Sequence, residues 1–256
     1  MIDNPKLRTH VAHHPYPLVF ATLSGAHLYG FPSPDSDFDL RGTHVLPLAE
    51  VVGLHDSAQT CEKEGVYDGL EIDLVTHDVE KFFRLMLRPN GYVLEQVLSP
   101  LVVHATPEHE ELCGIARKCV TRHHAHHYLG FAASQWKKFL ATESPEAPGS
   151  FRLKPLLYVY RVLLTGIHLM RTGRVEANLR VLVDGTPLRF LDELIEQKRS
   201  SQEKGMLEHC DLSFHQLQYE ALRGQLEQAH TDSHLPEQGT ALEQLNDLLV
   251  RLRLAS

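Results

Sequence analysis

The sequence predicts an α+β fold, with a small mixed-sheet domain followed by an all-helical domain. Up to about residue 104, apolar runs typical of buried strands alternate with apolar residues at helical spacing. Beyond that residue the signals are mainly helical. We therefore expect a first domain at residues 1–104 and a second at residues 105–256, because each is long enough to bury a core.

Three strands are expected in the first domain. The apolar run at 18–21, which ends at a Ser-Gly pair, predicts a buried strand. A second strand is expected at about 38–45 and a third at about 70–75. In the third, apolar residues alternate with Glu71 and Asp73, so its two faces must have different surroundings.

Two helices are expected after the third strand. Thr76 is the predicted N-cap of the first, whose apolar residues between Val79 and Leu87 follow helical spacing. A shorter helix is expected at 92–98, before Ser99-Pro100.

The second domain is expected to contain helices joined by short loops. Helices are predicted from Thr106-Pro107, through 128–136, at 151–172, from Thr186-Pro187 and at 242–252. A loop rich in proline, glycine and serine at 142–149 separates the second of these helices from the third.

Composition places the chain among water-soluble proteins. Hydrophobic residues make up 43% and charged residues 23%. No segment approaches the roughly 20 apolar residues that cross a bilayer, so we expect no membrane contact. The N-terminal segment lacks an apolar core followed by a small-residue cleavage site, which favours a cytoplasmic location. The cysteines form no CxxC pair and are expected to be reduced thiols: Cys61, Cys113, Cys119 and Cys210.

Charge is distributed unevenly along the chain. The formal net charge of −8 argues against a protein that coats nucleic acid. Two stretches, 117–138 and 152–174, carry lysine and arginine without any acid. The positive charge is therefore concentrated in the second half, where local basic surfaces can carry phosphate contacts.

The segment at 24–42 carries the residues most suited to catalysis. A small-residue turn at Ser24-Gly25 follows the first strand, and such a turn lets main-chain N–H groups approach phosphate. Asp37 and Asp39 are spaced by two on a strand and so point to one face. Because Mg²⁺ prefers oxygen ligands, often one or two carboxylates plus substrate phosphates, this pair suits phosphoryl chemistry.

The same segment, with its Tyr-Gly, Pro-Asp-Ser-Asp and Asp-Leu-Arg-Gly steps, resembles the nucleotidyltransferase motif of the DNA polymerase beta superfamily. It is most similar to the predicted nucleotidyltransferases of bacteria and phages, some of them linked to RNA repair, and the similarity continues through 90–95 and 154–173. The resemblance implies transfer of a nucleoside monophosphate from an NTP to a hydroxyl acceptor, with an RNA 3′ end as the expected acceptor. It also implies Mg²⁺, or Mn²⁺, as the cofactor.

The resemblance assigns site residues in the first domain. Asp73 matches the third metal-binding carboxylate, with Glu71 as the alternative. The phosphate turn comprises Ser24, Gly25 and Ala26, and Ala26 stands where the family usually has serine. The hydroxyl of Ser24 is the expected substitute. Arg41, next to the metal strand, is expected either to contact phosphate or to form a salt bridge.

The resemblance also assigns residues in the second domain. Lys154, Tyr158, Arg161 and Thr165 share one face of the predicted helix. Lys154 and Tyr158 are expected to contact the triphosphate and the base or sugar, with Arg161 in support. The alternative is an ordinary solvated helix face.

Two histidine features each allow two interpretations. The run at 123–127 has pairs at helical spacing that suit zinc, although a histidine-rich surface near RNA or a nucleotide is the favoured interpretation. His27, in the motif segment, is expected either to touch phosphate or to stabilise the turn.

Other functions fit the sequence less well. A protein hydroxyl or a small molecule is an alternative acceptor. The alanine at position 26 leaves open a catalytically weak nucleotide- or RNA-binding module. A helical ribonuclease is a third alternative, based on Arg161 and His168.

Overall fold

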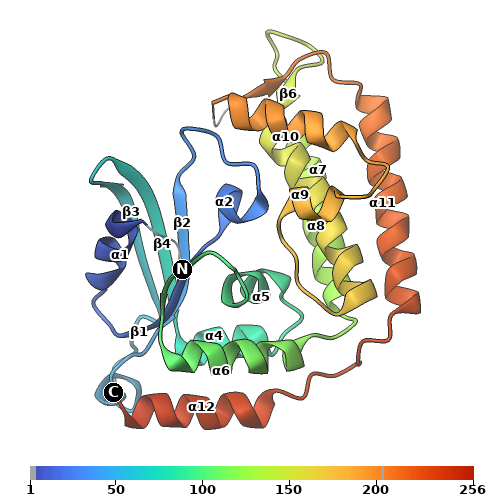
Figure 1. The fold of residues 1–256 in the computed structure, drawn as a ribbon. Helices are drawn as coiled ribbons and strands as arrows, with labels where there is room; N and C mark the ends of the chain where they lie inside the picture. Colours follow the sequence, from blue (N-terminus) through green and yellow to red (C-terminus); the bar gives the residue numbers. More distant parts are fainter. Residues whose placement is uncertain (1–3, 203–204) are drawn as a thin grey trace. The chain divides into compact units, whose positions relative to one another are not determined.

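The computed structural model describes residues 4–202 and 205–256 (Figure 1). Their contacts form two compact units. The first, called the sheet unit, contains the chain up to Leu28, Asp37–Val120 and Gln238–Ser256. The second, called the helical unit, contains Tyr29–Ser36 and Thr121–Glu237. This division differs from a single boundary at residue 104. Residues 29–36 belong to the helical unit, whereas residues 105–120 and 238–256 belong to the sheet unit.

The sheet unit is built on a five-stranded mixed sheet in the order β3-β4-β2-β1-β5. Its strands are β1 Leu18–Leu23, β2 Phe38–His44, β3 Thr60–Tyr67, β4 Leu70–Asp78 and β5 Val102–Ala105. The central pair β2 and β4 is parallel, whereas β1 runs antiparallel to β2 and β5, and β3 to β4. The expected strands at 18–21, 38–45 and 70–75 and the α+β class are confirmed.

Helices cover both faces of this sheet (Figure 1). On one face, Leu7 and Val11 of α1 (Pro5–Ala12) join a core with Leu40 and Leu74. On the other, the ring of Phe20 packs against two helices at centroid distances of 5.5 Å from Phe82 and 4.7 Å from His109. The remaining helices of this unit are α2 Gly25–Tyr29, α3 Leu48–Val51, α4 Val79–Met86, α5 Gly91–Val97, α6 Pro107–Ala116, the 3₁₀ turn Arg117–Cys119 and α12 Leu242–Leu254.

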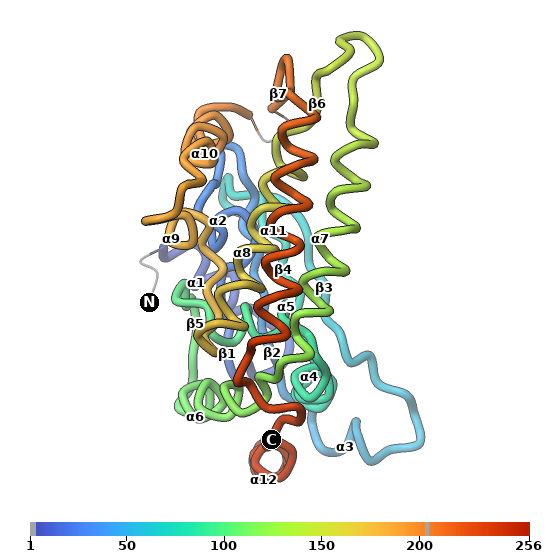
Figure 2. The backbone as a smooth tube through the Cα atoms, turned by 90° about the vertical axis from the view of Figure 1, so that its right-hand side faces the viewer, coloured from blue at the N-terminus to red at the C-terminus, as the bar shows by residue number. Residues whose placement is uncertain are grey.

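The N-cap of α4 is Asp78, so the prediction of Thr76 was wrong. Asp78 accepts a hydrogen bond from the main-chain nitrogen of Glu80 at 3.0 Å, while Thr76 lies inside β4. β4 continues beyond the expected end because each of its residues from Ile72 to Asp78 pairs with β2. Asp78 also forms a buried ion pair with Arg253 of α12. This pair joins the C-terminal helix to the sheet, where α12 packs against α4 and α6 (Figure 2).

The helical unit packs around α8 (Leu153–Thr172), most of whose residues are buried. α7 (His124–Leu140) and α11 (Leu212–Asp232) lie along it. The other elements are α9 Leu179–Val183, α10 Phe190–Ser200 and a two-stranded sheet of β6 Phe151–Arg152 and β7 Met206–Leu207. The expected start at Thr186-Pro187 was wrong: α10 begins at Phe190, and the Thr186 hydroxyl donates to the Val183 carbonyl at 2.7 Å. Among the described residues, no helix combines the length and apolar character needed to span a bilayer.

Candidate active site

The turn between β1 and α2 lies against the Asp39 carboxylate. The Ser24 nitrogen donates to the Asp39 carbonyl at 2.8 Å. Gly25 follows with φ of 58°, a left-handed backbone conformation that residues other than glycine rarely adopt. A Cβ at this position would overlap Oδ2 of Asp39. Glycine is therefore required both by the backbone angle and by the close approach to the carboxylate.

The parallel pairing of β2 and β4 sets two of the expected acids side by side. Asp39 and Asp73 are register partners, and their side chains are 18% and 31% exposed. Asp37 immediately precedes β2 and has the same strand parity as Asp39. Glu71 is exposed and comes before the first β4 residue that pairs with β2. Of the alternative third acids, Asp73 is thus the one beside Asp39.

Arg41 bridges these two acids. Its Nη2 lies 2.8 Å from Oδ1 of Asp39 and 2.7 Å from Oδ2 of Asp73. Burial lowers the pKa of Arg41, but Tyr92, Asp39 and Asp73 outweigh that effect and raise it. Of the alternatives for Arg41, the salt bridge is the one that this structure contains.

Tyr92 is a site neighbour that the analysis of single residues missed. Its hydroxyl accepts from Nε of Arg41 at 3.2 Å. Asn90 is the N-cap of α5, and its side chain accepts a hydrogen bond from the main-chain nitrogen of Tyr92 at 3.1 Å. This cap fixes the position of Tyr92 in the first turn of the helix. The sequence of 90–95 indicates only a family resemblance, because a half-exposed tyrosine at a helix start has no distinctive sequence signal.

Asp39 and Asp73 have the chemistry of a site for a hard cation, although the carboxylates of all three expected acids do not lie within 4.8 Å of one another among the described residues. Asp37, Asp39 and Asp73 offer only oxygen donors, as Mg²⁺ and Mn²⁺ prefer. The turn at Gly25 packs directly against the Asp39 carboxylate, where a Cβ would displace Oδ2. Arg41 reduces the repulsion among the carboxylates in the absence of a cation.

The neighbours of Gly25 are enclosed. Ser24 is fully buried, and its hydroxyl has no hydrogen-bond partner among the residues that the structure describes. Ala26 is 1% exposed. The Ser24 hydroxyl can therefore substitute for the family serine only if the turn opens to admit a phosphate oxygen. His27 stacks on Phe38 at 4.5 Å between ring centroids, a contact that fits a role in packing the turn.

The helical unit contains a basic pocket of about 400 Å³ that includes two of the expected residues, Lys154 and Tyr158. Two further cations, Lys138 and Arg152, line it. The lining is completed by Gln135, Thr142 and Pro155 and includes no acid. Such a set of cations beside an aromatic ring suits a phosphate-bearing ligand.

Arg161 and Thr165 lie on the same helix but do not line that pocket. They are 1% and 0% exposed, so the alternative of a solvated face is wrong for this part of α8. The Arg161 guanidinium lies over the ring of Tyr29, 3.8 Å from its centroid. His168 is half-buried and lines a different pocket of the unit, with Arg171.

The histidine run separates into different environments. One ring nitrogen each from His123, His126 and His230 of α11 lie within 4.8 Å of one another. His123 also contacts the Glu237 carboxylate at 2.9 Å. His124, in contrast, is fully buried.

Comparison with known proteins supplies a family. The sequence profile of the RNA repair pathway DNA polymerase beta family matches residues 2–251. An uncharacterized protein of Methanocaldococcus jannaschii is 32% identical over 162 residues, which are 62% of this chain and 63% of that protein. An uncharacterized protein of Bacillus subtilis is 25% identical over 203 residues, 76% of this chain and 75% of that protein. The chain thus spans less than two thirds of the archaeal relative.

Among solved structures, a nucleotidyltransferase-like protein from Exiguobacterium sibiricum is similar with a TM-score of 0.32 and 14% identity, covering 96% of this chain and 73% of that one. The family match extends over nearly the whole sequence and confirms the resemblance seen at residues 24–42. The chain belongs to the RNA repair pathway DNA polymerase beta family.

Proposed function

We propose that this protein transfers a nucleoside monophosphate from an NTP to the 3′ hydroxyl of an RNA and releases pyrophosphate. Asp37, Asp39 and Asp73 would hold Mg²⁺, or Mn²⁺. When bound, the cation would stabilise the charge that develops on the phosphate oxygens and on the leaving group.

The observation that carries this proposal is the register pairing of Asp39 with Asp73 beside the Gly25 turn. In the reaction, the acceptor oxygen forms a bond to the α-phosphorus while the bond from that phosphorus to the bridging oxygen breaks. The electron pair leaves with pyrophosphate. Arg41 occupies Oδ2 of Asp73, so we assign Oδ1 of Asp73 to position the acceptor hydroxyl and to receive its proton.

Basic residues of the helical unit support a polyanionic substrate. Lys138, Arg152 and Lys154 line one pocket, and Tyr158 gives that pocket an aromatic wall on which a base or sugar can pack. We propose that Lys154 and Tyr158 contact the nucleotide, and that the neighbouring cations contact nucleotide or RNA phosphates. Arg161 would act indirectly through its contact with Tyr29.

The test is a transfer assay with each labelled NTP and three acceptors: RNA ending in a 3′ hydroxyl, the same RNA blocked at its 3′ end, and protein. We expect metal-dependent extension of the unblocked RNA only. Labelled protein would favour protein nucleotidylation instead. NTP binding without turnover would favour a binding module.

A matched pair of variants identifies the third acid. Asp73→Asn should abolish transfer, because it removes a carboxylate beside Asp39. Glu71→Gln, two residues earlier on the same strand and exposed, should retain it. Equal activity of the two variants would contradict the assigned site.

A further inference from the structure

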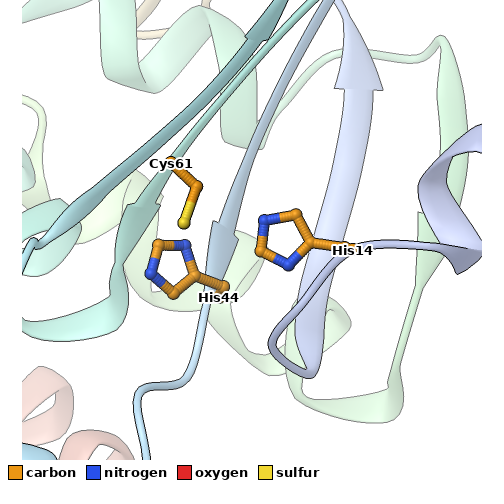
Figure 3. A group of neighbouring side chains, drawn as sticks. All are labelled: His14, His44 and Cys61. Carbon is orange, nitrogen blue, oxygen red and sulfur yellow. The ribbon is translucent and has the colours of Figure 1, made fainter.

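A second group of potential ligands lies on the opposite face of the sheet from Asp39. His44 is the last residue of β2 and differs from Asp39 in strand parity. His14 follows α1, and Cys61 lies on β3. One nitrogen of each ring and the Cys61 sulfur lie within 4.8 Å of one another, and the side chains face a common space (Figure 3).

The sheet and its neighbours hold this group in place. Thr76 of β4 is the cross-strand partner of Cys61. Its hydroxyl lies 2.9 Å from Nε2 of His14 and 2.9 Å from Nδ1 of His44. The ring of Tyr16 stacks on His44 at 5.2 Å between centroids. The ligand atoms therefore come from elements whose positions are fixed by strand pairing and ring packing.

The protonation states favour metal ligation. Burial lowers the pKa of His14, and it lowers the pKa of His44 to about 4. Each shift favours the deprotonated imidazole that a metal ion requires. Burial raises the pKa of the Cys61 thiol, so a bound cation has to displace its proton.

We propose that His14, His44 and Cys61 bind a Zn²⁺ ion at a site separate from the carboxylates of the nucleotidyltransferase centre. Sulfur and imidazole donors suit zinc and exclude magnesium as the preferred ion. Zinc bonds of about 2.0 Å to nitrogen and 2.3 Å to sulfur require the three ligand atoms to move closer by side-chain rotation. Ligation through Nε2 of His14 would exchange its hydrogen bond to Thr76 for a zinc bond, whereas Nε2 of His44 has no hydrogen-bond partner among the described residues.

Three protein ligands leave one position of a tetrahedral zinc site open, which a water molecule can fill. The carboxylate of Glu50, outside the three-ligand group, accepts from the Tyr16 hydroxyl at 3.4 Å. His14 also lines a surface pocket of about 530 Å³, so one member of the group borders a surface opening. Bound zinc would cross-link the end of α1 to β2 and β3.

The test uses the full-length protein stripped of metal by a chelator and titrated with Co²⁺, then with Zn²⁺. Cobalt bound to a thiolate gives a sulfur-to-metal charge-transfer band in the near ultraviolet. We expect that band to saturate at an equimolar amount of Co²⁺ and to disappear when Zn²⁺ is added. Neither the carboxylates of the active site nor the His123, His126 and His230 group can produce it, because they contain no sulfur.

Cys113→Ser is the matched control, since Cys113 is another half-buried free thiol of the sheet unit. The band should persist in Cys113→Ser and be lost in Cys61→Ser, with a band of shifted position in His14→Gln. Zinc should raise the thermal midpoint of the wild type and of Cys113→Ser, and not of Cys61→Ser. A wild-type protein without the band, or a Cys61→Ser variant that retains it, would overturn the proposal.

Discussion

Arg41 donates its Nη2 to Oδ2 of Asp73 at 2.7 Å, across the parallel strands β2 and β4. The same nitrogen contacts Asp39, so the arginine takes the position of a counter-ion between two acids. We expect Arg41→Ala to lower the free energy of unfolding by about 1.5–3 kcal/mol in a chelator, the range for charge-assisted hydrogen bonds. Mg²⁺ should raise the free energy of unfolding more in this variant than in the wild type. Without the arginine, Asp39 and Asp73 have no other positive charge between them.

Urea unfolding with a chelator and with Mg²⁺ measures this effect. Arg84→Ala is the control, since Arg84 forms an exposed pair with Glu80 one turn earlier on α4. Such a pair contributes less than about 1 kcal/mol, and its loss should not change the response to Mg²⁺. An identical Mg²⁺ response in Arg41→Ala and the wild type would show that Arg41 does not compensate the acid pair.

Gly25→Ala should abolish metal-dependent transfer. The new Cβ would overlap the Asp39 carboxylate, and the left-handed backbone at this position adds strain. Gly69→Ala tests the strain alone, because Gly69 also has positive φ but has open space around its Cβ position. It should cost about 1–3 kcal/mol of stability and retain transfer. If both variants lost transfer equally, strain rather than carboxylate displacement would be responsible.

The C-terminal helix should stabilise the sheet unit through Arg253. Its side chain is 8% exposed, and its partner Asp78 is fully buried. Arg253→Ala would leave an unpaired buried carboxylate and should cost about 3–5 kcal/mol. Arg251→Ala, on the same helix, removes an exposed pair with Glu111 and should cost less than about 1 kcal/mol. Thermal unfolding of the two variants distinguishes these results, and similar losses would contradict the role of the buried pair.

Acid should destabilise the metal-free protein through two histidines of the sheet, the buried His44 and the half-buried His77. Burial lowers the pKa values of His44 and His77 from 6.5 to about 4. Above 6.5 the folded and unfolded states are both deprotonated at these groups. As the pH falls from 6.5 toward 4, the unfolded state binds protons first, so the free energy of unfolding falls, by at most about 3 kcal/mol for each histidine.

Urea unfolding of the wild type and of His44→Gln across that pH range isolates the contribution of His44 to the pH dependence of the free energy of unfolding. Glutamine does not titrate, so the variant should lose less stability between 6.5 and 4. The same pH dependence in both proteins would contradict the lowered pKa of His44.

The sequence predicted those helices and strands that have a clear local pattern of apolar side chains. Alternating apolar residues identified β4, and helical spacing identified α4 and α12. β3 was missed because its sequence is polar and it forms through main-chain pairing with β4. α11 was missed for a related reason, since much of its surface is polar and its buried residues contact α8.

The candidate site was predictable as far as local spacing determines it. The pair Asp37 and Asp39 could be found from their separation of two residues. The position of Asp73 beside Asp39, and the bridge made by Arg41, depend on the register of β2 and β4, which no local pattern encodes. The zinc ligands likewise come from three separate elements.

The last prediction concerns the basic pocket of the helical unit. Lys154→Ala should weaken NTP binding and transfer by about 1–3 kcal/mol, the range for losing a charge-assisted hydrogen bond, without eliminating metal binding. If Lys154 contacts the leaving pyrophosphate as its charge develops, kcat should fall along with kcat/KM, rather than KM alone rising.

Lys137 provides a matched control, because it is exposed on α7 next to Lys138 but does not line the pocket. Lys137→Ala should leave the kinetics of NTP use unchanged, whereas Lys138→Ala should resemble Lys154→Ala in direction. Tyr158→Phe should cost less than Tyr158→Ala, because the phenyl ring retains the surface on which a base or sugar packs. Steady-state kinetics at varied NTP concentration measure all of these effects. If Lys154→Ala changed neither KM nor kcat, the pocket would not be the nucleotide site, and its cations would have to serve another anion.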